Sequence, residues 1–312
     1  PEGKLSYFPF DILVSEPVKQ FSGLFNQVPF LIRDYTIRYG YSATLMERLK
    51  KGDRIKLNKL IAFAPGYGNT SDMVASAGEF REITIDRSSL RSLPGSINEA
   101  MEIGKMTGGR AFTGPAASEE LFKKLAGESH IIHLATHAFL DDEDPLKSKL
   151  VFSEGNVEED GFLNVYEIYN LDLAARMVVL SACNTGTGGL KRGEGIMSLA
   201  RAFIYAGVPN IVMTLWTVSD KQSYELMLGF YRQLIAGRST EMALRRAKLE
   251  FLENAAPSYQ HPQYWAGYIL VGNPDTLFLS RMYKLIIPVL GIIMIMVPGL
   301  ILVRRKTGRS RS

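Results

Sequence analysis

Apolar residues along this chain gather in short runs that end in turn-forming residues. The clearest are residues 59–68 (KLIAFAPGYG), 130–136 (HIIHLAT), 177–182 (MVVLSA) and 209–218 (PNIVMTLWTV). Runs of this length that close on Gly, Pro or Ser predict β-strands. The run at 177–182 is continuous rather than alternating, which is typical of a strand covered on both faces. Residues 30–42 (FLIRDYTIRYGYS) are also β-rich, and we expect a strand there.

Segments with a helical period lie between these runs. We expect helices at Ser96–Lys105, where Ser96 and Glu99 have the spacing of a capping box, and at Ala117–Gly127, with Ser118 as N-cap. Residues 193–207 (GEGIMSLARAFIYAG) have apolar positions on one face and end at a glycine, which predicts an amphipathic helix. Two further helices are expected at Asp220–Ala236 and Thr240–Asn254.

The alternation of strands and helices predicts an α/β fold, with a mostly parallel sheet and helices on both of its faces. The chain has no internal repeats and no low-complexity linker. We therefore expect one folded domain over residues 1–280.

The last part of the chain has a different pattern. Residues Leu285–Val303 are nineteen residues without a charge, enough to cross the hydrocarbon core of a bilayer as a helix. The alternative is a buried core helix. The basic tail at 304–312 favours a transmembrane helix, because its five Lys and Arg act as a stop.

The placement of basic residues also predicts an orientation. Two basic residues, Arg281 and Lys284, precede the apolar segment, against five in the tail. The positive-inside bias then predicts a single-pass membrane protein with a cytoplasmic tail and an extracytoplasmic domain. The rival is a cytoplasmic domain with a tail anchor. Because the chain starts at Pro1, we expect it to be a piece of a longer protein that carries any export signal.

Charge and cysteine content narrow the function classes. The net charge of +4 and the pI near 9.0 come largely from the basic tail, so we expect no nucleic-acid partner. One cysteine in 312 residues excludes an intrachain disulfide and a multi-cysteine zinc site.

Two predicted strands end in residues that carry nucleophilic chemistry. One reaches His137 and the other reaches Cys183. Functional groups in open α/β sheets gather at the carboxyl ends of strands, where an imidazole can activate a thiol. The amides of Ala138 and Cys183 would face the same cavity and stabilise an oxyanion. From the residues alone, however, a lone cysteine after an apolar strand is more often a small core residue.

A metal site is the weaker explanation of the histidines. His133 and His137 are four residues apart but lie on a predicted strand and lack the glutamate of a HExxH motif. We expect no metal and no cofactor.

Long, ordered motifs resemble a known family. The sequence KLSYFPFDIL at the start, HLATHAF with DPLKSKLVF, LSACNTGTG, and HPQYWAGYILVGNPD at the end are similar to the CHAT domains of the caspase-like and separase-like cysteine peptidases. The resemblance implies a caspase-like fold, a catalytic pair at His137 and Cys183, a protein or peptide substrate, and tetratricopeptide-type (TPR-like) repeats upstream. The alternative is a non-hydrolytic signalling or scaffold module that keeps the fold.

One further residue has two interpretations. Asp220 follows a strand in the motif LWTVSD and opens a predicted helix. It suits a helix N-cap, as Ser219 does. The motif also resembles the separase-type W-x-V-x-D element, which implies that Asp220 lies in an S1 pocket and favours cleavage after a basic residue.

Overall fold

The computed structural model describes most of the first 278 residues of the chain. The described residues are 8–42, 44–45, 59–67, 90, 93–141, 143–154, 159–181, 183–184, 194–273 and 276–278.

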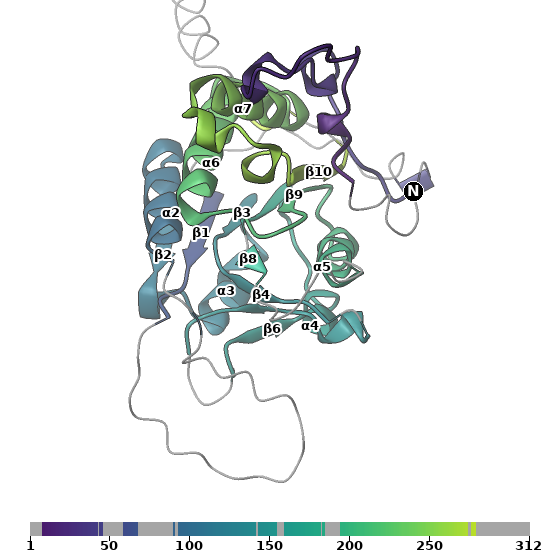
Figure 1. Ribbon diagram of the computed structural model, residues 1–312. Coiled ribbons are helices and arrows are strands. Elements are labelled where there is room, and N and C mark those ends of the chain that lie inside the picture. The colour runs from purple at the N-terminus through teal and green to yellow at the C-terminus, as the bar shows by residue number, and fades with distance from the viewer. Residues whose placement is uncertain are drawn as a thin grey trace, which may run out of the picture.

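A six-stranded sheet forms the centre of the molecule (Figure 1). Five of its strands are parallel, and the last of the described strands pairs antiparallel at one edge. The strand order is β10-β9-β7-β3-β1-β2. The strands are β1 (Leu60–Ala64), β2 (Arg110–Thr113), β3 (Ile131–Leu134), β7 (Met177–Leu180), β9 (Asn210–Thr214) and β10 (Tyr268–Gly272).

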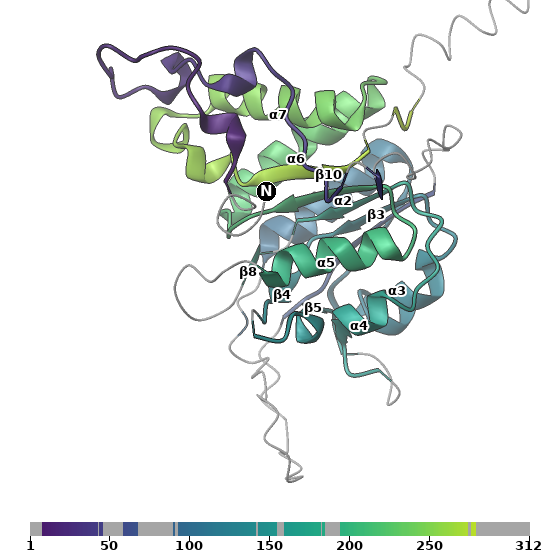
Figure 2. The ribbon, with the colours of Figure 1, turned by 90° about the vertical axis from the view of Figure 1, so that its right-hand side faces the viewer.

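Helices cover both faces of this sheet (Figure 2). One face carries α2 (Pro94–Thr107), α6 (Asp220–Ile235) and α7 (Thr240–Asn254). The other carries α3 (Glu119–Ala126), α4 (Val165–Ile168) and α5 (Glu194–Tyr205). Successive residues of a strand point to opposite faces. In β1, Ile61 and Phe63 pack into one apolar core, while Leu60, Ala62 and Ala64 pack into the other. This explains why the strands read as continuous apolar runs, and it confirms the mostly parallel α/β fold.

A second, smaller sheet lies beyond the carboxyl ends of β3 and β7. Its order is β6-β5-β4-β8, and its strands are β4 (His137–Phe139), β5 (Lys149–Val151), β6 (Phe162–Asn164) and β8 (Cys183–Asn184). Strand β4 follows β3 directly after Ala135 and Thr136, and β8 follows β7 in the same way. The two strands that carry the expected catalytic residues thus both follow strands of the main sheet and pair with each other in the small sheet.

The N-terminal segment packs along α7 (Figure 1). Within residues 8–42 it contains three 3-10 turns, and its β-pairing is limited to isolated bridges. The expected strand at residues 30–42 is therefore wrong. Phe30 and Ile32 are buried in the core, and the backbone between them turns instead of extending, with the amide of Arg33 donating to the carbonyl of Phe30 at 2.9 Å. The 3-10 turns of the described chain are Phe10–Ile12, Phe25–Gln27, Leu31–Arg33, Gly114–Ala116, Pro145–Lys147, Pro257–Tyr259 and Pro262–Tyr264.

Two helix ends follow the sequence closely. The side chain of Ser118 accepts a hydrogen bond from the amide of Leu121, which confirms Ser118 as the N-cap of α3. Helix α5 ends at Tyr205, and Gly207 takes φ +108°, a conformation that favours glycine. The capping box at Ser96 and Glu99 is wrong, because α2 already begins at Pro94 and both side chains contact other elements.

The structure corrects the prediction of a single-pass membrane protein. Within the described residues, no helix combines the length and apolar character needed to cross a bilayer. The expected membrane helix at Leu285–Val303 and the basic tail at 304–312 lie outside the described residues. The described residues therefore do not support the predictions of a membrane partner and of an extracytoplasmic domain.

Candidate active site

The small sheet brings the backbones of the two expected catalytic residues together. His137 is the first residue of β4 and Cys183 is the first residue of β8. The two strands are parallel, and His137 and Cys183 are direct Cα partners in the register. Neighbouring strands lie about 4.8 Å apart, and paired residues share a face of the sheet. Residues that are 46 positions apart in the chain are thus neighbours.

His137 is buried and has an aromatic neighbour that the sequence did not reveal. The ring of Tyr67 lies over the imidazole, with 4.5 Å between the ring centroids and an interplanar angle of 48°. Tyr67 belongs to the loop after β1, at the same carboxyl edge of the main sheet. Its position just after Pro65 and Gly66, the turn-forming residues that follow β1, was the signal in the sequence that pointed to this edge.

Ala138, the expected second oxyanion donor, lies inside the small sheet. It is buried and pairs with Leu150 of β5 on one side and with Asn184 of β8 on the other. The structure thus places Ala138 beside Cys183, one step further along the same ladder.

Asp220 is the first residue of α6, and its carboxylate contacts the beginning of α2. The amide of Gly95 donates to Oδ2 of Asp220 at 2.6 Å, and the hydroxyl of Ser96 donates to Oδ1 at 3.2 Å. Asp220 therefore caps a helix that is distant in sequence, because the first amides of α2 have no partner within the helix. The N-cap of its own helix is Ser219, whose side chain makes no capping hydrogen bond.

His133 is not brought to the same place as His137. It is fully buried in β3, where Nε2 lies 2.9 Å from Oε1 of Glu99 and Nδ1 lies 3.2 Å from the hydroxyl of Tyr231. The other carboxylate oxygen of Glu99 accepts from Ser223, whose hydroxyl is 3.0 Å from that of Ser181, the residue after β7. His133 is thus a core histidine, with a hydrogen bond to Tyr231 on one nitrogen and the carboxylate of Glu99 close to the other.

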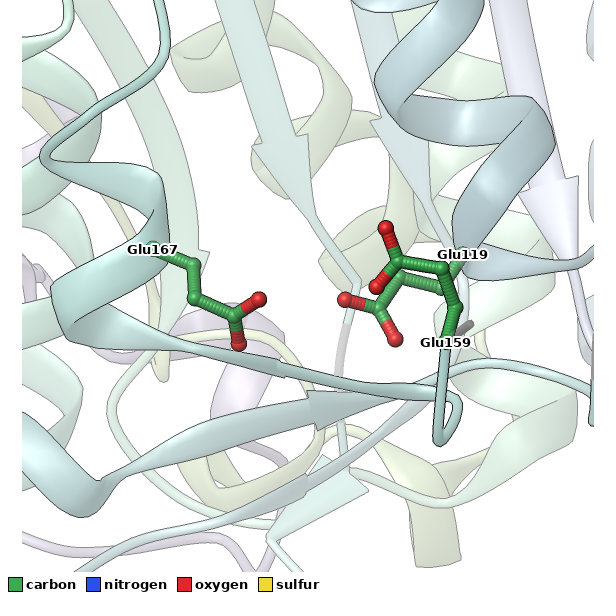
Figure 3. Close-up of side chains that lie close together, drawn as sticks. All are labelled: Glu119, Glu159 and Glu167. Carbon is green, nitrogen blue, oxygen red and sulfur yellow. The ribbon is translucent and has the colours of Figure 1, made fainter. Parts of the chain in front are cut away.

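A group of carboxylates other than the predicted catalytic residues has the geometry of cation ligands. Glu119 of α3, Glu159 and Glu167 of α4 each present a carboxylate oxygen, all within 4.8 Å of one another (Figure 3). The ammonium of Lys123 lies 2.8 Å from Glu119, 2.7 Å from Glu159 and 2.8 Å from Glu167. The lysine therefore supplies the positive charge that these carboxylates need.

Burial makes Glu119 sensitive to pH. Desolvation raises its pKa to about 7, although Lys123 opposes the rise. The folded chain therefore holds a proton that the unfolded chain releases between about pH 4.5 and 7, so this group lowers the free energy of unfolding as the pH rises through that window. Glu119→Gln removes the effect. As the pH rises from about 4.5 to 7, we expect the free energy of unfolding of the variant to increase relative to that of the native chain by on the order of 3 kcal/mol.

Urea unfolding at several pH values measures this difference directly. The matched control is Glu120→Gln, the exposed neighbour in the same helix turn. A stability gap between native chain and Glu119→Gln that stays constant from pH 4.5 to 8 would contradict the assignment.

Comparison with known proteins identifies the family. The family model described as "CHAT domain" matches residues 1–273. Among curated proteins, tetratricopeptide repeat protein 28 of Homo sapiens is 23% identical over 243 residues, and the Mus musculus protein matches equally. The match covers 67% of this chain but 10% of the human protein, so the chain spans about a tenth of the length of these relatives.

Solved structures resemble the fold at low sequence identity. The Saccharomyces cerevisiae separase–securin complex matches with a TM-score of 0.51 and 14% identity, covering 88% of this chain and 15% of that one. The Arg-specific cysteine proteinase gingipain R matches with a TM-score of 0.43 and 10% identity, over 76% of this chain and 51% of that one. The family match spans most of the chain, and the separase likeness agrees with its fold. This chain belongs to the CHAT domain family.

Proposed function

We propose that this CHAT domain is a cysteine endopeptidase that uses His137 and Cys183 as a catalytic dyad. The observation that supports it most is the register of the small sheet, in which the two residues are Cα partners on parallel strands. A nucleophile and its base must come within hydrogen-bond reach, and backbone pairing on one face of a sheet provides that proximity. The fold, which is shared with a separase, agrees with this chemistry.

The reaction follows from these roles. His137 takes the proton of the Cys183 thiol, and the thiolate attacks the carbonyl carbon of a peptide bond. The amides of Cys183 and Ala138 donate to the oxyanion that forms. The imidazolium gives its proton to the departing amine, which leaves a thioester on Cys183. His137 then accepts a proton from water, and the resulting hydroxide attacks the thioester carbonyl. The carbon–sulfur bond breaks, the carboxylic acid leaves, and the imidazolium returns its proton to the Cys183 thiolate.

The surroundings of the domain in a longer protein are part of the proposal. The curated relatives are named for tetratricopeptide repeats, and this chain corresponds to a small part of them. We propose that TPR-like repeats accompany this domain and select its protein substrates.

A non-hydrolytic scaffold is the second candidate. The curated relatives are named for their repeats and not for peptidase chemistry. The two functions differ in one measurable property, since a scaffold does not need a base beside its only cysteine.

The proposed specificity is for a basic residue before the cleaved bond, recognised by Asp220. A carboxylate pairs with a guanidinium through two parallel charge-assisted hydrogen bonds. The contacts of Asp220 with Gly95 and Ser96 would hold this carboxylate in place, and a carboxylate has further lone pairs for a substrate.

Cleavage of a peptide library tests both the function and the specificity. We expect the native chain to cleave after Arg and Lys, and Cys183→Ala to cleave nothing. Asp220→Asn retains an acceptor for α2 but removes the charge. The rate of cleavage after Arg should therefore fall roughly 30-fold or more, which corresponds to a loss of about 2–5 kcal/mol of binding to the basic residue. The rate of cleavage after apolar residues should change little. Ser96→Ala is the matched control, since it removes a contact of Asp220 but no charge.

Two outcomes would contradict these assignments. A library that the native chain and Cys183→Ala cleave equally slowly would refute the peptidase and favour the scaffold. If Asp220→Asn instead slows all substrates alike, Asp220 acts only as the cap of α2.

A further inference from the structure

The hydroxyl of Tyr67 joins the main sheet to the strand that carries His137. Tyr67 follows β1, and its hydroxyl accepts a hydrogen bond from the amide of His137 at 3.1 Å. The same hydroxyl donates to the carbonyl of Val151 in β5 at 2.9 Å and lies 2.5 Å from the hydroxyl of Thr136. One side chain therefore links the loop after β1, the start of β4 and the end of β5.

The ring of Tyr67 restrains the imidazole as well as the backbone. The phenol ring lies against the His137 ring in a tilted arrangement, with 4.5 Å between the centroids and 48° between the planes. Rotation of the imidazole about its side-chain bonds would drive it into this neighbour, because interiors are packed without spare volume.

The loop that carries Tyr67 is itself held by a close backbone approach. A Cβ added to Gly66 would lie 2.9 Å from Cα of Gly114, closer than real contacts, so only glycine fits there. Gly114 begins a 3-10 turn, and its carbonyl accepts from the hydroxyl of Ser153 at 2.6 Å. Tyr67 thus directly follows a residue whose backbone is closely packed against Gly114.

We propose that Tyr67 is a positioning residue for the catalytic base. Its hydroxyl fixes the backbone at His137, and its ring fixes the plane of the imidazole relative to β8. The inference rests on the proposed function, because it gives His137 the role of base. Small displacements of a catalytic group cost large factors in rate, so a residue that holds the base should affect the reactivity of the thiol.

The single cysteine of the chain provides a direct measurement of this effect. The rate of alkylation by iodoacetamide, measured from pH 5 to 10, reports on Cys183 alone. A thiol paired with an imidazolium stays reactive well below the usual thiol pKa of about 8.5. For the native chain we expect this low-pH reactivity, and for His137→Ala a profile that moves toward about pH 8.5.

Two variants of Tyr67 separate the ring from the hydroxyl. Tyr67→Phe keeps the ring contact and should lower the rate at pH 6.5 roughly 3- to 10-fold. Tyr67→Leu loses both contacts and should lower it by roughly 100-fold. The control is Tyr39→Phe, which also removes a buried hydroxyl with two backbone contacts, to the carbonyl of Phe8 at 2.7 Å and from the amide of Phe10 at 3.0 Å. It should lower stability but keep the native pH profile.

The outcomes separate the inference from the function on which it rests. If both Tyr67 variants keep the native profile while His137→Ala loses it, Tyr67 has no positioning role. If His137→Ala has the native profile, the dyad itself is refuted, whatever Tyr67 does. Should Tyr67→Leu fail to fold, Tyr67→Phe decides alone, because it changes no packing volume beyond one oxygen.

Discussion

Replacing His137 with alanine is expected to slow peptide cleavage by about 10²–10⁴-fold at neutral pH, the usual cost of losing a general base. The reason lies in the small sheet. His137 is the register partner of Cys183, so its loss removes the group that would accept the thiol proton. The measurement is kcat/KM for the peptide that the native chain cleaves best.

The control is a variant of another histidine, which lies before β3 and not after it. His130→Ala changes the residue just before β3, at the opposite end of the main sheet from His137. We expect near-native cleavage from it. Added imidazole should restore part of the activity of His137→Ala, because it replaces the missing base. If the two alanine variants lose activity and thermal stability in parallel, His137 has a structural role only.

The largest effect on stability is expected at a buried ion pair remote from the active site. Nζ of Lys248 in α7 lies 3.1 Å from Oδ2 of Asp11, and the two side chains are 2% and 6% exposed. Burial lowers the pKa of Lys248, and the charge of Asp11 opposes this shift. The pair fastens the N-terminal segment to α7.

Removing one partner leaves the other charge buried without compensation. We expect Lys248→Met to reduce the free energy of unfolding by about 3–5 kcal/mol in urea. The double variant Asp11→Leu with Lys248→Met should recover most of this loss, since two apolar side chains leave no charge to desolvate. The control is Arg232→Met, which breaks an exposed pair with Glu250 and should cost at most about 1 kcal/mol. Equal losses in Lys248→Met and Arg232→Met would contradict the account.

The elements that depend on local pattern were predictable from the sequence. The central strands and the long helices follow from apolar period and length, and the N-cap at Ser118 follows from a contact three residues away. Residues 30–42 show the limit of this reasoning. Their β-rich composition predicts a strand, but burial of Phe30 and Ile32 against distant elements is achieved by a turn.

The candidate site was predictable in its residues but not in its geometry. Strand ends identified His137 and Cys183, yet no local signal predicts a second sheet in which they are register partners. The roles of Glu99 and Asp220 depend on partners in other elements, His133 and the start of α2. Tyr67 was missed for the same reason, because its partners lie about 70 and 84 residues further along the chain.

The central claim is that Cys183 is a nucleophile activated for attack on a peptide carbonyl, and a peptidyl electrophile with a basic P1 residue tests it most directly. Intact mass and peptide mapping after incubation at neutral pH should find one adduct, on Cys183. The adduct should be absent in Cys183→Ala and form at least about 100-fold more slowly in His137→Ala. Equal labelling of the native chain and His137→Ala, or no labelling of a native chain that iodoacetamide still alkylates, would contradict the account.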